Sequence, residues 1–176
     1  MNSVLLGIDI GTSACKVAAF DSDGVVLAQT TQGYNVYYPE PGFVEQDPME
    51  WWHAVTKAIR DILDTGKVKP EEIVGIGVDG QSWSAIPVDK EGNVLHNTPI
   101  WMDTRSKDIC DELNCKVGAE RIFSISGNSL EPTYTTAKIL WFKHNKPEVY
   151  NKTHKFLQSN SFITYKLTGV MTQDKS

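Results

Sequence analysis

The stretch that decides the fold is Ile8-Asp9-Ile10-Gly11-Thr12-Ser13-Ala14-Cys15-Lys16-Val17-Ala18-Ala19-Phe20. Two short apolar runs flank the small polar turn Gly11-Thr12-Ser13, which is the pattern of two β-strands joined by a hairpin. A second turn, Asp21-Ser22-Asp23-Gly24, follows directly, and its Asp-Gly pair readily adopts the positive φ of a tight turn. The sequence therefore predicts three strands, over residues 3–10, 15–21 and 25–31, that form an antiparallel meander.

A helix is predicted to begin at Pro48. Asp47 suits the N-cap, Pro48 the first helical position and Glu50 the third position of a capping box. The apolar residues that follow keep helical spacing up to a glycine stop at Gly66. They are Trp52, Val55, Ile59, Ile62 and Leu63. Residues 73–78 then form a short, β-branched run with glycines, which is typical of a strand covered on both faces.

The remainder of the chain is predicted to be mainly helical. Residues 85–88 and 94–96 flank a turn and indicate a second hairpin-like pair. A helix is expected over residues 104–113, with Asp103 or Thr104 as its cap. Shorter helical patterns cover 119–124 and 136–145, whereas the spacing in 156–167 does not separate strand from helix. This order of elements predicts an α/β fold and excludes simple helical bundles and β-sandwiches.

Composition and charge exclude several classes of protein. The 176 residues are 40% hydrophobic and 22% charged, which is ordinary globular usage and about the length of one domain. The net charge is −5 with interspersed signs, so no nucleic-acid partner is expected. Three cysteines without metal-ligand spacing favour a reducing compartment. No apolar run approaches about 18 residues, so we expect a cytoplasmic protein with no membrane partner.

The turn between the first two predicted strands carries the best candidate chemistry. Backbone N–H groups and hydroxyls of Gly11, Thr12 and Ser13 suit a phosphate, because small side chains leave the backbone accessible. Asp9 suits a hydrated Mg²⁺, and Lys16 suits the same phosphates. The turn is neither a Walker A loop nor a dinucleotide fingerprint, since both run into a helix. The plainer interpretation is a hairpin turn in which Asp9 accepts a local hydrogen bond.

Several motifs, in order along the chain, resemble the N-terminal domain of the FGGY carbohydrate kinases. The segment Asp9-Ile10-Gly11-Thr12-Ser13 is similar to the first phosphate motif of that family. The other matching segments are Glu45-Gln46-Asp47-Pro48 with Trp51-Trp52, Gly77-Val78-Asp79-Gly80-Gln81, Trp101-Met102-Asp103-Thr104-Arg105 and Lys166-Leu167-Thr168-Gly169. Within the family, the pattern is more similar to xylulokinase-like members than to glycerol kinases.

The resemblance implies a fold and a reaction. The fold is an actin-like ATPase (ribonuclease H-like) α/β domain, in which a mixed sheet opens in a three-strand meander and an α-helical insertion follows on the sugar side. The reaction is transfer of the ATP γ-phosphate to a hydroxyl of an open-chain sugar or polyol, with a xylulose-like ketose favoured. The cofactors are ATP and Mg²⁺, the substrate is a small molecule, and the family pattern allows a homodimer.

The resemblance also assigns roles to individual residues. Asp9 would serve the metal, and Gly11, Thr12, Ser13 and Lys16 would bind the ATP phosphates. The sugar pocket would contain Gln81, Ser82, Trp83, Asp103 and Thr133. Four residues depart from the family pattern. Ser82-Trp83 stands where xylulokinases usually have Met-His and glycerol kinases Arg-Glu, Thr133 replaces a tyrosine of glycerol kinases, and Ser161 replaces a frequent aspartate.

Two of these candidates have alternative interpretations. Trp83 suits stacking on an apolar sugar face, but aromatic residues more often belong to a core. Asp103 suits a helix N-cap as well as sugar contact, and the two roles are compatible.

The resemblance places the catalytic general base beyond Ser176. We therefore expect residues 1–176 to form an FGGY actin-like domain that ends before its C-terminal part, without the second actin-like domain. The parent protein would be a phosphotransferase with an alcohol acceptor, and the fragment alone would be inactive. The alternative is a noncatalytic phosphate-, nucleotide- or sugar-binding module of the actin-like superfamily. A noncatalytic regulator of that superfamily is disfavoured by the Glu45-Gln46-Asp47-Pro48 and Gly80-Gln81 features.

Overall fold

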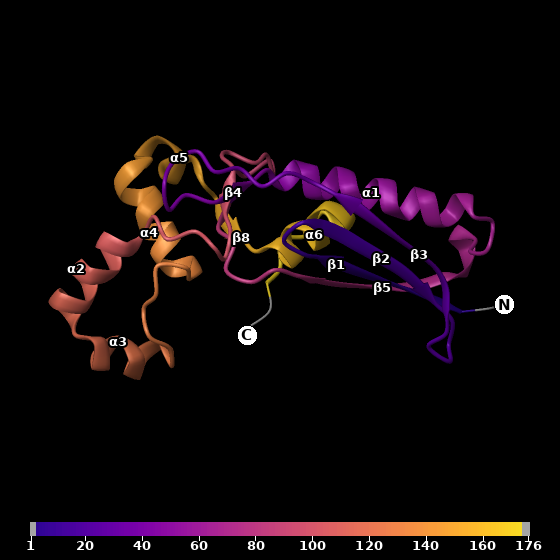
Figure 1. Cartoon of the computed structure of the whole chain (residues 1–176), viewed down its shortest axis with the longest axis horizontal. Coiled ribbons are helices and arrows are strands. Elements are labelled where there is room, and N and C mark those ends of the chain that lie inside the picture. The colour runs from indigo at the N-terminus through magenta and orange to yellow at the C-terminus, as the bar shows by residue number, and fades with distance from the viewer. Residues whose placement is uncertain (1–2, 174–176) are drawn as a thin grey trace. The chain divides into compact units, whose positions relative to one another are not determined.

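The computed structural model describes residues 3–173, and they divide into two compact units. The first unit combines the N-terminal residues up to Val36 with Asp47–Gln81 and the residues from Ser159 onward. The second unit consists of Tyr37–Gln46 and Ser82–Gln158. The chain passes several times between the units, so neither is a continuous segment of sequence (Figure 1).

The first unit is built on a four-stranded mixed sheet with the order β3-β2-β1-β5. Its strands are β1 (Val4–Ile10), β2 (Ala14–Phe20), β3 (Val26–Gly33) and β5 (Ile73–Gly80). β1 and β3 both pair antiparallel with β2, whereas β5 pairs parallel with β1. The parallel pairing follows from the intervening helix, because a crossover is needed to bring the chain back in the same direction.

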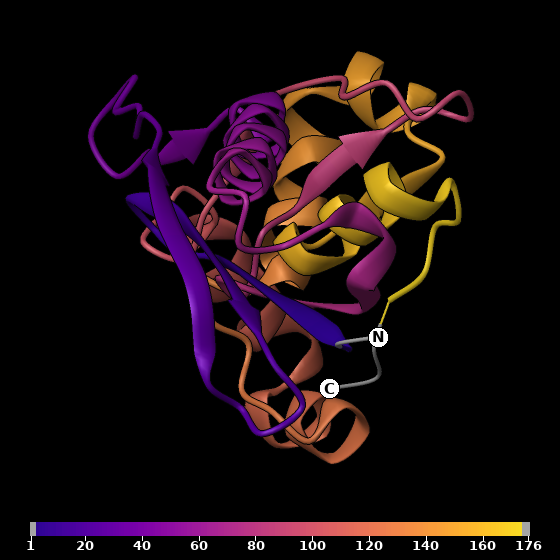
Figure 2. The same cartoon turned by 90° about the vertical axis from the view of Figure 1, so that its right-hand side faces the viewer.

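Two helices cover one face of this sheet. α1 (Pro48–Asp64) packs against β2 and β3, and α6 (Ser159–Thr168) packs against β5 and α1 (Figures 1 and 2). The predicted start of α1 is confirmed, since the Asp47 carboxylate accepts a hydrogen bond of 2.8 Å from the backbone N–H of Met49. The buried core of this unit includes Leu6, Ile8, Ile10, Cys15, Val17, Trp51, Val55, Phe162 and Ile163.

The expectation that residues 73–78 are covered on both faces is wrong for the structure described. Val74 is 65% exposed and Ile76 is 45% exposed. β5 is an edge strand of the sheet, and the short helix α6 reaches Gly80 at its carboxyl end. A short 3₁₀ helix, Pro70–Glu72, precedes the strand. The apolar, glycine-containing pattern therefore predicts the strand correctly, but it does not predict how many faces of the strand are buried by other elements.

The second unit contains short strand pairs and four helices among its described residues. β4 (Glu45–Gln46) pairs with β7 (Thr98–Pro99), and β6 (Ile86–Val88) pairs with β8 (Lys155–Leu157), both antiparallel. The helices are α2 (Lys107–Val117), α3 (Ala119–Ser126), α4 (Thr135–Asn145) and α5 (Pro147–Lys152). A cluster of Ala85, Ile109, Trp141 and Phe142 forms a buried core beneath them. The undecided segment 156–167 is divided between β8 and α6.

The predicted cap of the helix over 104–113 is wrong. α2 begins at Lys107, and Ser106, rather than Asp103 or Thr104, is its N-cap residue. The Asp103 carboxylate instead accepts hydrogen bonds from the backbone N–H groups of Val44 and Arg105, which holds the preceding residues in a turn. The sequence could not distinguish these uses of an aspartate, because both satisfy nearby backbone donors. None of the helices in the described residues has the length and apolar character needed to span a bilayer.

Candidate functional site

The turn between β1 and β2 is fixed from three sides. Within the turn, the Gly11 N–H donates to the carbonyl of Ala14 at 3.1 Å. The Gly11 carbonyl in turn accepts from the Tyr34 hydroxyl and, at 3.4 Å, from the Gln81 side-chain amide. A Cβ added at Gly11 would lie 3.1 Å from the Ala14 carbonyl oxygen, so this close approach favours glycine. The backbone at the turn is therefore held in place before any ligand binds.

Three charged side chains lie on the open face of the sheet beside this turn. Asp9 in β1 is directly opposite Lys16 in β2 and in register with Asp79 in β5. Residues paired in this way project from the same face of a sheet. Asp9 is half-buried, whereas Lys16 and Asp79 are exposed. The structure thus places the Asp9 carboxylate beside Lys16, the two charged residues predicted from the sequence. It also adds a second carboxylate, that of Asp79.

A cavity of about 550 Å³ occupies the same face. Asp9 and Lys16 line it together with apolar, small and polar residues of the three meander strands. The apolar residues are Val17 and Phe20. The small residues are Gly7 and Ala18, and the polar ones are Gln29, Thr30 and Thr31. Such a surface can accommodate a polar ligand, because small side chains leave room and the lysine supplies positive charge.

Burial makes the residues beneath the turn chemically inert. The pKa of the Cys15 thiol is raised to about 12 by burial and by the nearby Asp9 carboxylate. Burial, with Cys15 and Asp9 as further contributors, also raises the pKa of the Tyr34 hydroxyl. Both groups therefore stay protonated at neutral pH, and Tyr34 remains a hydrogen-bond donor to Gly11. Cys15 is fully buried and belongs to the core of the first unit.

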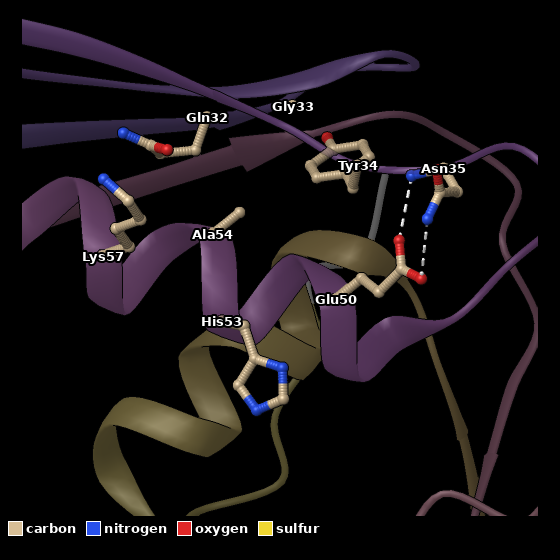
Figure 3. Close-up of a pocket in the computed structure, with 8 residues that line it drawn as sticks. All are labelled: Gln32, Gly33, Tyr34, Asn35, Glu50, His53, Ala54 and Lys57. Atoms are coloured by element: carbon tan, nitrogen blue, oxygen red, sulfur yellow. Dashed lines mark hydrogen bonds between the residues drawn. The ribbon is translucent and has the colours of Figure 1, made fainter.

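A second cavity, of about 380 Å³, lies between α1 and the end of β3 (Figure 3). Its lining includes Tyr34, Asn35, Glu50, His53 and Lys57. The Glu50 carboxylate accepts hydrogen bonds from the backbone N–H and the side-chain amide of Asn35, at 2.9 and 3.2 Å. These bonds tie the end of β3 to the first turn of α1. The lining contains none of the predicted site residues.

Gln81 is the predicted sugar residue that the structure places at the turn. Its backbone N–H donates to the Ile10 carbonyl at 2.8 Å, and its own carbonyl accepts from the Ser159 hydroxyl at 2.8 Å. Gln81 therefore continues the parallel pairing of β1 and β5 beyond the strand ends. The carboxyl ends of parallel strands are where open α/β sheets usually bind ligands.

The other predicted sugar residues belong to the second unit. Ser82 is exposed, and Thr133 is half-buried directly before Tyr134. Trp83 has a φ of 64° and is 39% exposed, so the alternative interpretation of Trp83 as a core residue is wrong. Its ring lies 4.7 Å from the ring of Tyr134, centroid to centroid.

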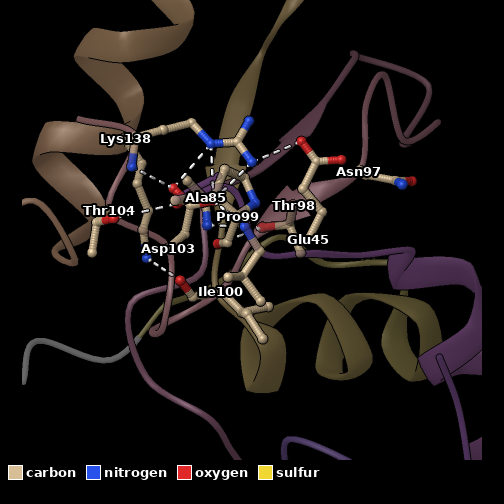
Figure 4. A network of polar contacts seen from close by, with 12 residues as sticks. Glu45, Ala85, Asn97, Thr98, Pro99, Ile100, Asp103, Thr104 and Lys138 are labelled. Carbon is tan, nitrogen blue, oxygen red and sulfur yellow. Dashed lines mark hydrogen bonds and ion pairs between the residues drawn. The ribbon is translucent and has the colours of Figure 1, made fainter. Parts of the chain in front are cut away.

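Asp103 is fully buried in a network of ion pairs and hydrogen bonds (Figure 4). Its carboxylate accepts from Val44 N–H at 2.6 Å and from the Arg105 guanidinium at 2.8 to 3.0 Å. Arg105 also pairs with Glu45 at 2.8 Å, and its guanidinium carbon lies 4.1 Å from the centre of the Phe43 ring. The carboxylate is therefore compensated by a buried cation, as a buried charge requires.

Lys138 of α4 completes this network. Its ammonium donates to the carbonyl of Ile100 at 2.7 Å and to that of Trp83 at 2.8 Å. Burial lowers the pKa of Lys138 to about 7, against a raising effect of Asp103, and Arg105 lowers it further. A lysine buried among carbonyls and charged groups is uncommon, because such residues are mostly exposed.

Sequence reasoning missed three of these residues: Asp79, Tyr134 and Lys138. Asp79 lies inside a quoted motif, but the strand predicted over residues 73–78 had no assigned partner or register, so its place beside Asp9 could not be predicted. Lys138 precedes Trp141 and Phe142 by three and four positions, so the helical period places it on their buried face. No local signal marks the contact of Tyr134 with Trp83, because it depends on the fold of a loop 51 residues earlier in the chain.

Comparison with known proteins identifies the family. Residues 4–176 match the FGGY family of carbohydrate kinases, N-terminal domain. The chain belongs to this family. The FGGY domain is 31% identical to the xylulose kinase of Bacillus subtilis (strain 168) over 172 residues, which cover 98% of this chain and 34% of the relative. It is 35% identical to the glycerol kinase of Aquifex aeolicus (strain VF5) over 172 residues, or 95% of this chain and 34% of that protein.

The solved structures agree with this family. The crystal structure of gluconate kinase from Lactobacillus acidophilus superimposes with a TM-score of 0.89 at 28% identity, covering 97% of this chain and 34% of that one. The mixed α/β architecture is thus that of the FGGY sugar kinases, an actin-like ATPase fold. The chain spans about a third of the length of the relatives it matches.

Proposed function

We propose that the protein containing this chain is an ATP-dependent carbohydrate kinase, which transfers the γ-phosphate to a hydroxyl of an open-chain sugar or polyol. A xylulose-like ketose is the favoured acceptor. The observation that carries this proposal is the fixed Gly11 turn with Asp9 and Lys16 paired across two strands beside it. Phosphoryl transfer depends chiefly on positioning and electrostatic stabilisation, and such a turn supplies both.

On the ATP side, we assign the phosphates to Gly11, Thr12, Ser13 and Lys16. Backbone N–H groups and hydroxyls of the turn would orient the phosphate oxygens, and the Lys16 ammonium would neutralise part of their charge. These residues suit the role because the turn has small side chains and because Lys16, which follows the turn in β2, lines the cavity on the open face of the sheet.

The residues also fit a magnesium ion. Mg²⁺ is usually bound through one or two carboxylates together with waters and substrate phosphates. Asp9 supplies one carboxylate, and Asp79, in register beside it, is available as a second. Residues 3–173 contain no group of three or more His, Cys, Asp or Glu side chains that would hold a metal by themselves. When bound, the ion would neutralise charge that develops on the transferred phosphoryl group.

On the acceptor side, we assign Gln81, Ser82, Trp83, Asp103 and Thr133 to the sugar pocket, with α2, α3 and α4 as the helical sugar-side insertion. Trp83 offers an exposed aromatic face to the apolar side of a sugar. Asp103 would act through the buried network that it forms with Arg105, because its oxygens already accept hydrogen bonds there. We further propose a cytoplasmic location and allow a homodimer as the assembly.

The test of this function is ADP release by the intact protein with a panel of pentuloses and polyols. We expect at least one acceptor to support turnover and Asp9→Asn to lower kcat/KM about 10²- to 10³-fold, the usual cost of one electrostatic group at a transferring phosphate. Asp9 lies in β1 on the open face of the sheet, outside the apolar core, so the melting temperature should stay within a few degrees. Asp23→Asn, in the exposed turn after β2, is the matched control and should leave turnover unchanged.

Two outcomes would contradict this assignment. Full activity of Asp9→Asn would remove Asp9 from the phosphate site, and unfolding of the variant would show that Asp9 has a structural role in β1. Binding of ATP or a sugar by the intact protein without ADP release would instead support the alternative of a noncatalytic binding module.

A further inference from the structure

Trp83 has an unusual backbone conformation for its residue type. Its φ of 64° lies in the left-handed region, and it is the one non-glycine residue with positive φ in the part of the chain that the structure describes. A bulky residue in this region is a genuine outlier, which costs on the order of 1–3 kcal/mol and persists only where the surroundings enforce it. Some feature of the second unit must therefore stabilise Trp83 in this conformation.

Three hydrogen bonds supply that stabilisation. The Trp83 N–H donates to the Gln158 side-chain oxygen at 3.2 Å, and the Trp83 carbonyl accepts from the Lys138 ammonium at 2.8 Å. One residue further, the Ser84 carbonyl accepts from the Thr135 hydroxyl at 3.3 Å. Both peptide groups of Trp83 are thus bound by side chains from other elements, and two of the three come from α4.

Lys138 is suited to this role because it joins two segments. Its ammonium bridges the carbonyls of Trp83 and Ile100, and its side chain is fully buried. Burying a lysine is costly, and a hydrophobic residue of the same length would pack there without that cost. The lysine therefore contributes something that packing alone does not, namely two directed hydrogen bonds to backbone carbonyls.

The consequence of this conformation is the position of the Trp83 ring. The ring packs against Tyr134, with 4.7 Å between centroids and 39° between planes, while 39% of the residue stays exposed. Tyr134 directly precedes α4, the helix that carries Lys138. One helix thus positions both the backbone of Trp83 and the aromatic partner of its side chain.

We propose that Lys138 and Gln158 are positioning residues that hold Trp83 in its left-handed conformation, so that Trp83 and Tyr134 form one aromatic wall of the acceptor pocket. This proposal rests on the proposed kinase function, in which Trp83 faces the sugar. Lys138 and Gln158 do not touch the substrate, and they act through the peptide groups of Trp83.

The first test compares Lys138→Met with Lys143→Met in the intact protein. Methionine retains an apolar side chain of similar length but cannot donate to the two carbonyls. Lys143 is an exposed lysine of the same helix and is the matched control. We expect Lys138→Met to raise the KM for the best acceptor about tenfold, as the loss of one charged hydrogen bond does. The KM for ATP should stay unchanged, and Lys143→Met should alter neither constant.

The second test measures the environment of the Trp83 ring by spectroscopy and does not depend on enzymatic turnover. The near-UV circular dichroism and acrylamide quenching of Trp83 are obtained by subtracting the spectrum of a Trp83→Phe counterpart from that of each protein. We expect Lys138→Met to weaken the dichroism that arises from the Trp83–Tyr134 pair and to increase quenching. If no acceptor supports turnover but these changes occur, the kinase function fails while the positioning role stands.

A second variant distinguishes the loss of Trp83 positioning from a general loss of folding in Lys138→Met. Gln158→Leu removes the acceptor of the Trp83 N–H at a half-buried position, where leucine is tolerated. It should change the acceptor KM and the Trp83 signals in the same direction as Lys138→Met. Equal changes in the KM for ATP and for acceptor, or Trp83 signals that stay as in the parent protein in both variants, would overturn the proposal.

Discussion

At the scale of single residues, the features that matter most are buried or strained polar groups. Lys138 and Asp103 are both fully buried, and each is bound to partners from a different part of the second unit. Such groups are costly when unpaired, so they are retained where their hydrogen bonds fix a particular geometry. In this chain Lys138 fixes the Trp83 loop, and Asp103 fixes the residues before α2 against Val44.

The lowered pKa of Lys138 predicts a pH dependence of stability. An unfolded lysine has a pKa of about 10.4, whereas burial lowers that of Lys138 to about 7. Between these two pH values the unfolded chain binds more protons, so the free energy of unfolding should rise with pH and fall again toward pH 7. The contribution of this single lysine has a slope of up to about 1.4 kcal/mol per pH unit.

Urea unfolding of the parent chain and of Lys138→Met at pH 7, 8 and 9 measures this effect. The parent should gain stability relative to the variant as the pH rises. The charged groups that face the ammonium are the Asp103 carboxylate and the Arg105 guanidinium, and both are present in the two proteins. A difference in free energy that stays constant from pH 7 to pH 9 would show that Lys138 does not titrate in this range.

At the scale of elements, the close approach of β5 and α6 positions Gln81. A Cβ added at Gly80 would lie 2.4 Å from the Ser159 hydroxyl, which itself donates to the Gln81 carbonyl. The glycine at the end of β5 is therefore needed for the first turn of α6 to reach the strand. The packing of β5 on α6 therefore also fixes the position of Gln81, the residue that directly follows β5.

Gly80→Ala should therefore be destabilising. The added methyl group would displace Ser159 and weaken its hydrogen bond, and overpacking of this kind costs about 1–3 kcal/mol. Gly77→Ala is the matched control in the same strand, since a Cβ there meets nothing within 4 Å. We expect the control to change the free energy of unfolding by less than about 0.5 kcal/mol. Equal stabilities of the two variants in chemical denaturation would contradict the close packing of β5 on α6.

At the scale of the whole molecule, the chain spans about a third of the length of its relatives. It contains a candidate phosphate turn in its first unit and candidate sugar residues in both units. Transfer of a phosphoryl group to a hydroxyl also needs a carboxylate base within reach of the hydroxyl proton. We expect that base to lie beyond Ser176.

We expect residues 1–176 alone to have no measurable sugar kinase activity. A coupled ADP-release assay with pentuloses and polyols measures this directly, with the intact protein as the positive control. Robust turnover by the 176-residue chain would show that it contains its own base, and the assignment of the base beyond Ser176 would then be wrong.

Much of the fold could be predicted from local patterns. The turn at Gly11 to Ser13, the Asp47 cap and the helix that begins at Pro48 are all specified by residues within a few positions of one another. The start of α2 was missed, because Asp103 bonds to Val44, which is 59 residues earlier. The cover of β5 was overestimated, since an apolar strand pattern does not reveal which neighbouring elements lie on each face.

The sequence by itself determined the family, the meander strands and the position of the turn at Gly11 to Ser13, because these depend on short motifs and on the chemistry of individual side chains. The tertiary structure alone decided that Asp79 stands beside Asp9, that Asp103 is buried with Arg105, and that Lys138 binds the Trp83 carbonyl. These contacts join residues that are far apart in the chain. They depend on strand register and helix packing, which local sequence patterns do not encode.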